Sequence, residues 1–343
     1  KGGERYTHFT SSLYSVSKMK KVHVIGGGLA GLAVAYFARK AGHSVTVYDK
    51  GGNRSASFIS FGLMHPFVGL KGLLSEKGLE GMRESEALIS IASKALDQQP
   101  LFTKGAYRVC INGFQKTMFN RWSKRLPGMV RKLSDEEIAS YGYLRKDSQI
   151  YEIMCARSVN MPLYLKGLRL AFEHLGGCYV EQWVEEEVFP KEDLVVYAVG
   201  HYIDHFKATS DLGVNLVKGQ LLIGERPEGV DLKKSVLGKG YIGQSGNDLV
   251  VGATYEKEIN DDKVDKEKAM DDIIPKLATY TNFNKPLKVH SVRVGIRVVN
   301  KAHYFPIAKQ LSPREYVVSG MGSRGLLYHA LIGKQIVSIL QSG

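Results

Sequence analysis

The chain has 343 residues and a formal net charge of +13. This length is enough for about two domains with a sizeable hydrophobic core, so no disulfide or metal is needed for folding. The three cysteines lack paired spacing, and no apolar run reaches the roughly 20 residues of a membrane span. We therefore exclude disulfide-rich secreted proteins and membrane proteins, and we expect a cytoplasmic location. The excess positive charge favours a polyanionic partner, of which RNA is the obvious candidate.

The first 18 residues are rich in Ser, Thr and Tyr and lack apolar periodicity. We expect a disordered extension there, because Met19 starts a stretch that resembles the beginning of a short bacterial protein. Glu4 is the only acid in this segment. A remnant of an organellar transit peptide is therefore the alternative, and it would imply an organellar location.

The predicted elements begin with a βαβ unit. Residues 22–25 form a short buried strand, and apolar residues over 29–37 recur at helical spacing. Gly42 ends this helix, and residues 44–48 alternate as a second strand. The later predictions, in chain order, are a glycine- and serine-rich stretch over 51–72, helices over 79–96 and 162–175, a buried strand over 194–199, an antiparallel sheet over 214–256 with turns at 238–240 and 245–248, a charged helix over 263–277, a strand over 316–319 and a helix over 326–340.

The turn between the first strand and helix carries the most informative motif, Gly26-Gly27-Gly28-Leu29-Ala30-Gly31. In a GxGxxG fingerprint the first glycine makes the tight turn, the second lets the backbone approach a pyrophosphate, and the third lets the helix pack on the sheet. Asp49 follows at the distance where a carboxylate binds ribose hydroxyls and disfavours a 2′-phosphate. The motif therefore predicts dinucleotide binding other than NADP, with a purely structural glycine turn as the alternative.

The order of elements predicts an α/β protein with a Rossmann-like nucleotide domain and an interleaved antiparallel-sheet (α+β) domain. We assign residues 19–70, 151–215 and 290–343 to the nucleotide domain. Residues 71–150 and 216–289 are assigned to a substrate domain. The nucleotide domain is thus predicted to be assembled from separated segments of the chain.

Several further segments resemble the D-amino-acid-oxidase/glycine-oxidase superfamily of FAD enzymes. They are Ser55-Ala56-Ser57, Gly62-Leu63-Met64-His65-Pro66, residues 194–200, Lys218-Gly219-Gln220, residues 251–254, Gly295-Ile296-Arg297 with Pro306, and residues 320–326. The resemblance covers residues 21–343 and implies FAD rather than NAD. It departs from the family pattern at Val298, Val299 and Asn300, where Thr, Pro and Asp are usual, and at Ala308, where glycine is usual.

Two short segments are similar to a narrower group within this superfamily. The loop Gly322-Ser323-Arg324-Gly325-Leu326 and the segment 62–66 resemble the FAD oxidase half of the bifunctional bacterial enzymes that make 5-methylaminomethyl-2-thiouridine in tRNA. Stand-alone relatives of that half occur in plants and chlamydia-like bacteria. Because only about 20 residues precede the fingerprint, any methyltransferase step is expected to need a separate partner.

The resemblance implies noncovalent FAD, since no cysteine lies near the segment where some family members attach the flavin. The residues expected to bind it are Gly26, Gly28, Leu29, Ala30, Gly31, Asp49, Ser55, Ser57, Gly62, Ala198, Gly200, Gly322, Ser323, Arg324, Gly325 and Leu326. The loop 323–325 would stabilise negative charge on the reduced flavin. The alternative for Ser323 is an ordinary helix N-cap.

Arg297 is the candidate for binding a substrate carboxylate, because a guanidinium can grip a carboxylate through two parallel hydrogen bonds. A structural salt bridge is the alternative for Arg297. Arg324 could pair with flavin or substrate, or with a surface acid. Two placements are considered for each of four tyrosines, in the pocket lining or in the core: Tyr241, Tyr255, Tyr304 and Tyr328. Structural roles are expected for His65 and His329, and no metal is expected at His201 and His205, which lack an HExxH glutamate.

The segment 98–134 is basic and aromatic. Its candidate RNA-binding residues are Lys116, Arg121, Lys124 and Arg125. Interleaved with these cations are Phe102, Tyr107, Phe114, Phe119 and Trp122. Cations for phosphates beside flat rings for unstacked bases are typical of single-stranded RNA recognition. A solvated basic helix over a small core is the equal alternative.

Taken with the resemblance, these features predict an FAD-dependent oxidation of a secondary amine. The expected substrate is 5-carboxymethylaminomethyl-(2-thio)uridine at the wobble position of tRNA, which would lose its carboxymethyl group as glyoxylate. The alternatives are a free amino-acid or amine oxidase acting on glycine or sarcosine, an FAD-dependent 2-hydroxy acid dehydrogenase, and a noncatalytic FAD-containing RNA-binding protein.

Overall fold

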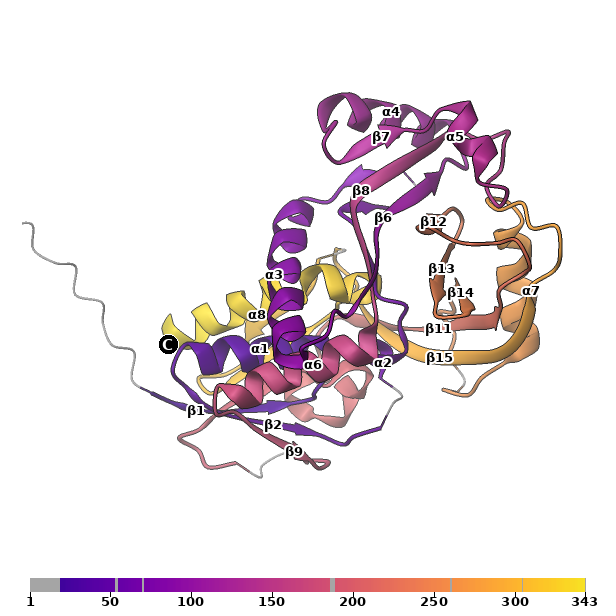
Figure 1. Ribbon diagram of the computed structural model, residues 1–343. Coiled ribbons are helices and arrows are strands. Elements are labelled where there is room, and N and C mark those ends of the chain that lie inside the picture. The colour runs from indigo at the N-terminus through magenta and orange to yellow at the C-terminus, as the bar shows by residue number, and fades with distance from the viewer. Residues whose placement is uncertain are drawn as a thin grey trace, which may run out of the picture.

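The computed structural model of the protein describes residues 19–52, 55–69, 71–185, 189–259, 261–303 and 305–342. The expected extension over 1–18 and the candidate Tyr304 lie outside the described residues. Two sheets organise the chain, and Figure 1 shows them at opposite sides of the molecule.

The first sheet has six strands with β1 (Lys21–Ile25) near its centre. Its spatial order is β16 (Ile307–Gln310), β17 (Glu315–Ser319), β10 (Leu194–Tyr197), β1, β2 (Ser44–Asp49) and β9 (Cys178–Glu181). All neighbours are parallel except the β16–β17 pair. The buried strands predicted over 22–25 and 194–199 and the strands predicted over 44–48 and 316–319 are thereby confirmed.

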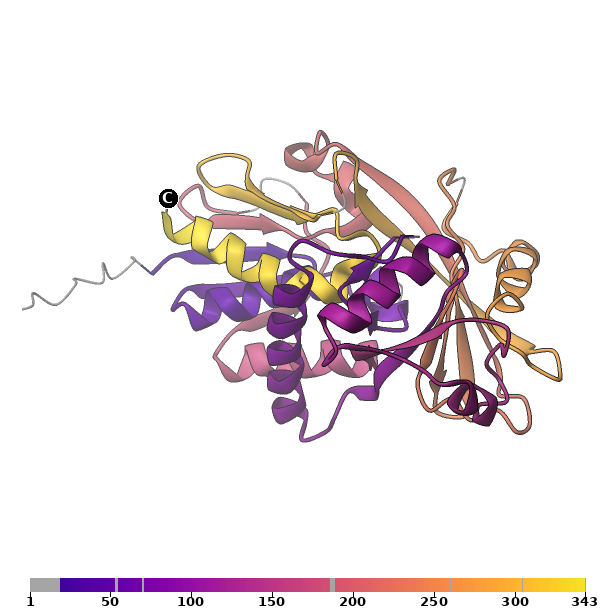
Figure 2. The same ribbon diagram turned by 90° about the horizontal axis from the view of Figure 1, so that it is seen from above.

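One face of this sheet is covered by helices, and Figure 1 shows them stacked above β1 and β2. They are α1 (Leu29–Lys40), α3 (Gly78–Leu96), α6 (Met161–His174) and α8 (Gly325–Ser342). Figure 2 shows α8 running beside α1. Helix α6 begins where the Asn160 side chain accepts a hydrogen bond from the backbone N–H of Leu163 (3.2 Å). The opposite face packs against the short 3-10 segments η1 (Gly200–His205) and η2 (Lys207–Thr209).

The second sheet has nine strands and is mostly antiparallel. Its members are β15 (Lys288–Asn300), β11 (Val214–Glu225), β14 (Asp248–Gly252), β13 (Tyr241–Ser245), β12 (Ser235–Leu237), β6 (Leu101–Val109), β8 (Ile150–Val159), β3 (Leu63–Met64) and β7 (Val130–Lys132), the last of which pairs with β8. Helix α7 (Lys266–Leu277) packs on one face of this sheet. It starts at Lys266 rather than at 263 because Asp265 caps it, accepting from the N–H of Lys268 (3.0 Å).

The two sheets and their cores do not follow three of the expected domain boundaries. Helix α3, assigned to the substrate domain, packs on α6 and α8 in the core of the first sheet. Strands β8 and β15, assigned largely to the nucleotide domain, belong to the second sheet. The apolar pattern shows that each element is buried, but it carries no information about which of two cores buries it.

The remaining small elements connect or extend the two sheets. They are α2 (Ala56–Ile59), β4 (Phe67–Val68), β5 (Leu73–Leu74), α4 (Gly113–Arg125), α5 (Asp135–Ser140) and η3 (Gly322–Arg324). Figure 1 shows α4, β7 and α5 grouped together at the far ends of β6 and β8. None of the described helices combines the length and apolar character that a bilayer crossing requires.

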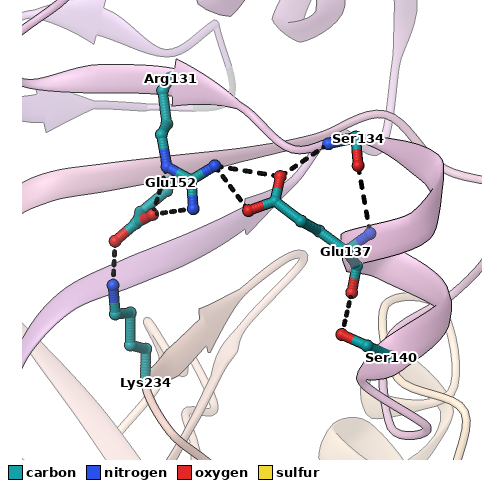
Figure 3. A network of polar contacts seen from close by, with 6 residues as sticks. All are labelled: Arg131, Ser134, Glu137, Ser140, Glu152 and Lys234. Atoms are coloured by element: carbon teal, nitrogen blue, oxygen red, sulfur yellow. Dashed lines mark hydrogen bonds and ion pairs between the residues drawn. The ribbon is translucent and has the colours of Figure 1, made fainter.

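A polar network joins β7 and α5 to β8 of the second sheet (Figure 3). Glu152 of β8 is buried and forms ion pairs with Arg131 (2.8 Å) and Lys234. Arg131 also binds Glu137 (2.7 Å), whose carboxylate completes a capping box with Ser134 at the start of α5. A buried carboxylate is tolerated only when it is paired, so this network determines how β7 and α5 sit. Arg131, a cation of the basic segment 98–134, is thus already paired with two carboxylates.

His329 of α8 is a satisfied structural residue, as expected. Its Nε2 accepts a hydrogen bond from the hydroxyl of Tyr164 (2.6 Å), while Nδ1–H donates to the carbonyl of Leu326 (2.9 Å). Both partners are buried, and burial lowers the pKa of His329 to about 4. This pair joins α6 to the first turn of α8.

The depressed pKa of His329 makes a prediction about acid stability. In the unfolded chain the imidazole of His329 binds a proton below its ordinary pKa of 6.5. In the folded protein the same imidazole stays neutral down to a pH of about 4. The contribution of His329 to the free energy of unfolding is therefore fully present above pH 6.5. It decreases by up to about 3 kcal/mol as the pH falls toward 4. Urea unfolding of the wild type and of His329→Gln between these pH values should show a shallower pH dependence in the variant. Parallel curves would contradict the assignment.

Candidate active site

A cavity of about 810 Å³ lies between the two sheets and is lined by residues from both. This volume is within the range of small-molecule and cofactor sites. Its first end is formed by the turn after β1 and the end of β2. Its second end is formed by β11, β13, β15 and the turn before α8.

The turn after β1 brings backbone rather than side chains to the cavity. Gly26 has a φ of +104°, donates its N–H to the carbonyl of Tyr48 (2.7 Å), and packs so closely on Ala198 that a side chain would overlap it. A Cβ on Gly31 would overlap the carbonyl of Gly26. Helix α1 begins at Leu29 without a side-chain cap at Gly28. The unsatisfied N–H groups and the helix dipole of such a start favour a phosphate group.

Asp49 fixes the geometry beside this turn. Its two carboxylate oxygens accept hydrogen bonds from the N–H groups of Gly27 (2.5 Å) and Gly51 (2.9 Å). The hydroxyl of Tyr179, from the edge strand β9, lies against Gly27. Burial and the nearby charge of Asp49 raise the pKa of Tyr179 to about 12, so its hydroxyl stays protonated. A carboxylate at this position can also accept hydrogen bonds from ribose hydroxyls.

Cations and aromatic rings that the sequence did not reveal surround this first end. Arg169 of α6 stacks on Tyr179, with 3.8 Å from its Cζ to the ring centroid. Lys50 lies over the ring of Tyr202 (4.2 Å) and donates to its hydroxyl (2.5 Å), beside the exposed Trp183. None of these residues belongs to a motif, and they meet only because β2, β9, α6 and η1 converge. All five line the cavity.

The middle of the cavity is formed by the glycine- and serine-rich stretch. Ser55 caps α2 by accepting from the N–H of Phe58 (3.2 Å), and Ser57 accepts from the N–H of Leu29 (3.2 Å). His65 also lines the cavity, and its Nδ1 is buried without a hydrogen-bond partner among the described residues. Burial, together with the charges of Arg108 and Arg324, lowers the pKa of His65 to about 3. His65 is therefore a neutral imidazole at physiological pH.

At the second end, the turn 319–326 forms one wall. The hydroxyl of Ser319 is buried there without a partner among the described residues. Ser323 lies inside the 3-10 turn η3, and its hydroxyl makes no hydrogen bond to the described residues, so the N-cap role considered for it is not observed. Arg324 does not line the cavity, although its charge acts on His65. The lining residues of this turn include Gly322, Ser323 and Gly325 on either side of the arginine.

Arg297 of β15 also lines the second end, and its strand runs beside the turn 319–326 because Val299 bridges to Met321. Its Nη2 donates to the carbonyl of Thr254 (3.3 Å), and its guanidinium packs against the backbone of Gly219. It is largely buried, which lowers its pKa, and no carboxylate of the described residues pairs with it. The salt bridge considered as its alternative role is thus not observed within that part of the chain. A buried, unpaired guanidinium is a ready partner for a carboxylate ligand.

The two tyrosine candidates at this end differ in burial. Tyr241 stacks on Phe61 (5.9 Å between centroids), and burial raises its pKa to about 12 against the opposing charge of Arg297. Tyr255 is 54% exposed, and its ring lies 5.9 Å from the Cζ of Arg297. Tyr328 is fully buried in the core, so its core role is the observed one.

Most residues predicted to bind the cofactor line this one cavity. They are Gly26, Gly28, Leu29, Ala30, Asp49, Ser55, Ser57, Gly62, Ala198, Gly200, Gly322, Ser323, Gly325 and Leu326. Gly31 and Arg324 do not, and Gly31 acts instead through helix packing, as its place in the motif implies. The described residues contain no cluster of three His, Cys, Asp or Glu side chains able to hold a metal.

Comparisons with known proteins identify the family. The sequence pattern of the family described as "FAD dependent oxidoreductase" (DAO) matches residues 21–339.

The chain belongs to the FAD dependent oxidoreductase family.

FAD is therefore the cofactor, and the first domain is the Rossmann-like FAD domain that the sequence predicted. The tRNA 5-methylaminomethyl-2-thiouridine biosynthesis bifunctional protein MnmC of Campylobacter fetus is 24% identical over 300 residues, which are 83% of this chain and 46% of that protein. The chain thus spans about half the length of the curated relatives it matches.

Among solved structures, glycine oxidase from Bacillus cereus superposes with a TM-score of 0.79 at 20% identity, covering 94% of this chain and 95% of that one. Iminodiacetate oxidase from Chelativorans gives a TM-score of 0.75 at 20% identity, with the same coverage. These likenesses establish the fold, and the resemblance inferred from the motifs is confirmed at the level of the family.

The cavity residues fit FAD on their own evidence. Gly26 and Gly31 leave no room for a side chain around the start of α1, and Asp49 stands where a ribose would lie. Buried polar atoms of His65 and Ser319 lack partners among the residues described. Five cations and two carboxylates are among the described lining residues, an excess that suits a pyrophosphate. When bound, FAD supplies the hydride-accepting ring that no side chain of the protein offers.

Gly28 provides a test of the cofactor cradle. A Cβ at this position would lie 3.1 Å from the Ser57 hydroxyl and meet no backbone, so the fold should tolerate alanine. The added methyl should crowd the pyrophosphate and weaken FAD binding about tenfold, which corresponds to about 1.4 kcal/mol. FAD affinity is measured by titrating the apoprotein and following flavin fluorescence. Gly113→Ala, at a position open to solvent space, is the matched control. Equal affinities in both variants would remove Gly28 from the cradle.

Proposed function

We propose that the protein oxidises a secondary amine that carries a carboxymethyl group, with 5-carboxymethylaminomethyl-(2-thio)uridine in tRNA as the substrate. The observation that carries this proposal is Arg297, a largely buried guanidinium that lines the cavity and has no acidic partner among the described residues. A carboxylate bound there would place the neighbouring methylene carbon and amine within the cavity.

The residues around Arg297 support this orientation. Gly219 leaves space for the guanidinium, and the carbonyl of Thr254 holds one of its nitrogens. Phe61 and Leu221 give this end an apolar wall that excludes water. An amine in such surroundings loses part of its proton affinity, and the neutral amine is the form that can release a hydride from the adjacent carbon. The resulting imine would be hydrolysed by water to glyoxylate and the aminomethyl nucleoside.

The turn before α8 would favour negative charge on a bound ligand. The N–H groups in the first turn of α8 carry the positive end of its helix dipole. No cysteine is among the described residues that line the cavity, which supports noncovalent FAD. Positioning and fixed dipoles are what such chemistry requires, and it does not depend on an acid–base pair.

The choice of tRNA rests on several features together. They are the Gly322–Leu326 loop, the net charge of +13, and the likeness to an MnmC protein whose name records tRNA modification. The iminodiacetate oxidase with the same fold takes its name from a carboxymethylated secondary amine. A separate methyltransferase would complete the modification. The proposed activity would then lie in the cytoplasm, or in an organelle with its own tRNA.

The direct test is anaerobic mixing of the FAD-loaded protein with tRNA that carries carboxymethylaminomethyluridine. We expect bleaching of the flavin band and a nucleoside whose mass lacks the carboxymethyl group. Unmodified tRNA is the control and should leave the flavin oxidised. Bleaching by glycine or sarcosine but not by modified tRNA would instead identify a free amino-acid oxidase. Bleaching by a 2-hydroxy acid would identify a dehydrogenase, and tRNA binding without bleaching would indicate a noncatalytic protein.

Arg297→Lys should mainly raise KM for a carboxylate-bearing amine. Lysine keeps the charge but loses the bidentate geometry. We therefore expect KM to rise roughly 10- to 100-fold, equivalent to the about 1.5–3 kcal/mol of a hydrogen bond to a charged group. Steady-state kinetics with modified tRNA and with sarcosine measure the effect. The same amines lacking the carboxylate serve as a control and should show little difference between wild type and variant. Unchanged kinetics with the carboxylate substrates would remove Arg297 from the site.

The basic helix α4 is the surface that we propose binds the tRNA body. All four of its candidate residues are exposed, namely Lys116, Arg121, Lys124 and Arg125. The aromatic part of the earlier hypothesis is corrected, because Tyr107 and Phe119 are buried and Trp122 donates to the carbonyl of Gly72 (2.9 Å). Only Phe114, at 50% exposure, remains largely open to solvent on this helix. The helix therefore offers cations for phosphates and little surface for base stacking.

Charge reversal of Arg121, Lys124 and Arg125 to glutamate tests this surface. If these residues neutralise phosphates, tRNA binding should weaken, and its slope against the logarithm of salt concentration should fall by about one for each phosphate that is no longer neutralised. Filter binding at several salt concentrations gives both quantities. Oxidation of sarcosine is the control for an intact active site. An unchanged affinity and slope would exclude α4 as the tRNA surface.

A further inference from the structure

The second end of the cavity opens beside the hairpin formed by β13 and β14. Tyr241, the first residue of β13, pairs with Gly252, the last of β14. Residues just before 241 and just after 252 therefore lie at the same edge of the sheet. Lys239 and Tyr255 come from these two segments, and both line the cavity. Both are also exposed, so they stand at its mouth.

Tyr255 is unusual among the aromatic rings of the cavity. Most of these rings are partly or fully buried, whereas Tyr255 is 54% exposed. It approaches the guanidinium of Arg297 (5.9 Å) and leaves much of its surface open to solvent. An exposed ring at the entrance of a binding site is a stacking surface for a flat ligand, and nucleobases stack on such rings irrespective of their identity.

Lys239 adds a charge to this surface. It sits in the turn between Gly238 and Gly240, and Gly240 packs on the carbonyl of Gly252, which holds the turn beside the segment that carries Tyr255. No ion pair joins Lys239 to a carboxylate of the described residues. An exposed ammonium next to a stacking ring is the combination that binds a nucleotide, with the ring on the base and the cation on a phosphate.

We propose that Tyr255 and Lys239 form a nucleotide-binding site at the cavity mouth. Tyr255 stacks on the pyrimidine that bears the reacting arm, and Lys239 binds a phosphate beside it. This inference rests on the proposed function and names the residues that make it selective for a nucleotide. The arm between base and carboxylate is only a few bonds long. The base and the carboxylate must therefore be held a few ångströms apart, as the ring of Tyr255 and the guanidinium of Arg297 are.

The test compares two substrates that share the carboxymethylamino group. One is an anticodon stem-loop RNA carrying 5-carboxymethylaminomethyluridine, and the other is sarcosine. For Tyr255→Ala we expect the ratio of kcat/KM for the RNA to that for sarcosine to fall about 5- to 100-fold, the range expected when one base–aromatic stack is removed. Tyr255→Phe keeps the ring and should restore the ratio. Lys239→Ala should also lower the slope of RNA binding against the logarithm of salt concentration by about one, while Lys239→Arg keeps it.

Lys309→Ala, an exposed lysine on β16 outside the cavity lining, controls for loss of one positive charge. Flavin content and circular dichroism confirm that each variant folds and binds FAD. Equal losses on both substrates, or an undiminished ratio in Tyr255→Ala, would overturn the nucleotide site while the wild type still oxidises the RNA. A wild type that oxidises sarcosine but never the RNA would overturn the proposed function as well. The two failures are therefore distinguishable.

Discussion

The close backbone packing between the turn after β1 and the end of β10 is the constraint on which the rest of the structure depends. Gly26 lies against Ala198, and Gly31 lies against Gly26, so α1 starts directly above the sheet edge. This approach leaves the first N–H groups of α1 facing the cavity and brings Asp49 within hydrogen-bond distance of Gly27. A side chain at either glycine would push the helix away and displace the cofactor cradle with it.

The second sheet supplies what this cradle lacks. The FAD domain provides backbone dipoles and a carboxylate for the cofactor, while β11, β13 and β15 bring Arg297, Tyr241 and an apolar wall to the other end of the cavity. The network of Glu152 with Arg131 and Lys234 ties β7 to the same sheet, and α4 packs on β7. The surface proposed for tRNA and the site proposed for its wobble nucleotide are thereby built on one continuous framework.

Sequence reasoning predicted those parts of the site whose chemistry is local. The fingerprint over 26–31 and Asp49 were recognisable because strand, turn, helix and strand follow one another directly along the chain. Arg297 was recognisable only through resemblance. Tyr179, Arg169 and Lys239 were not found, because they belong to no motif and reach the cavity through the pairing of β9 with β2, the placement of α6 and a hairpin turn. Likewise, α3 was assigned to the other domain because amphipathic spacing does not say which core a helix covers.

The most direct test of the account is a crystal structure of the protein loaded with FAD. We predict a ribose on the carboxylate of Asp49, the pyrophosphate at the start of α1, and the flavin ring between Arg297 and the turn that precedes α8. Density for FAD in any other place, or a nicotinamide dinucleotide in this cavity, would contradict the account.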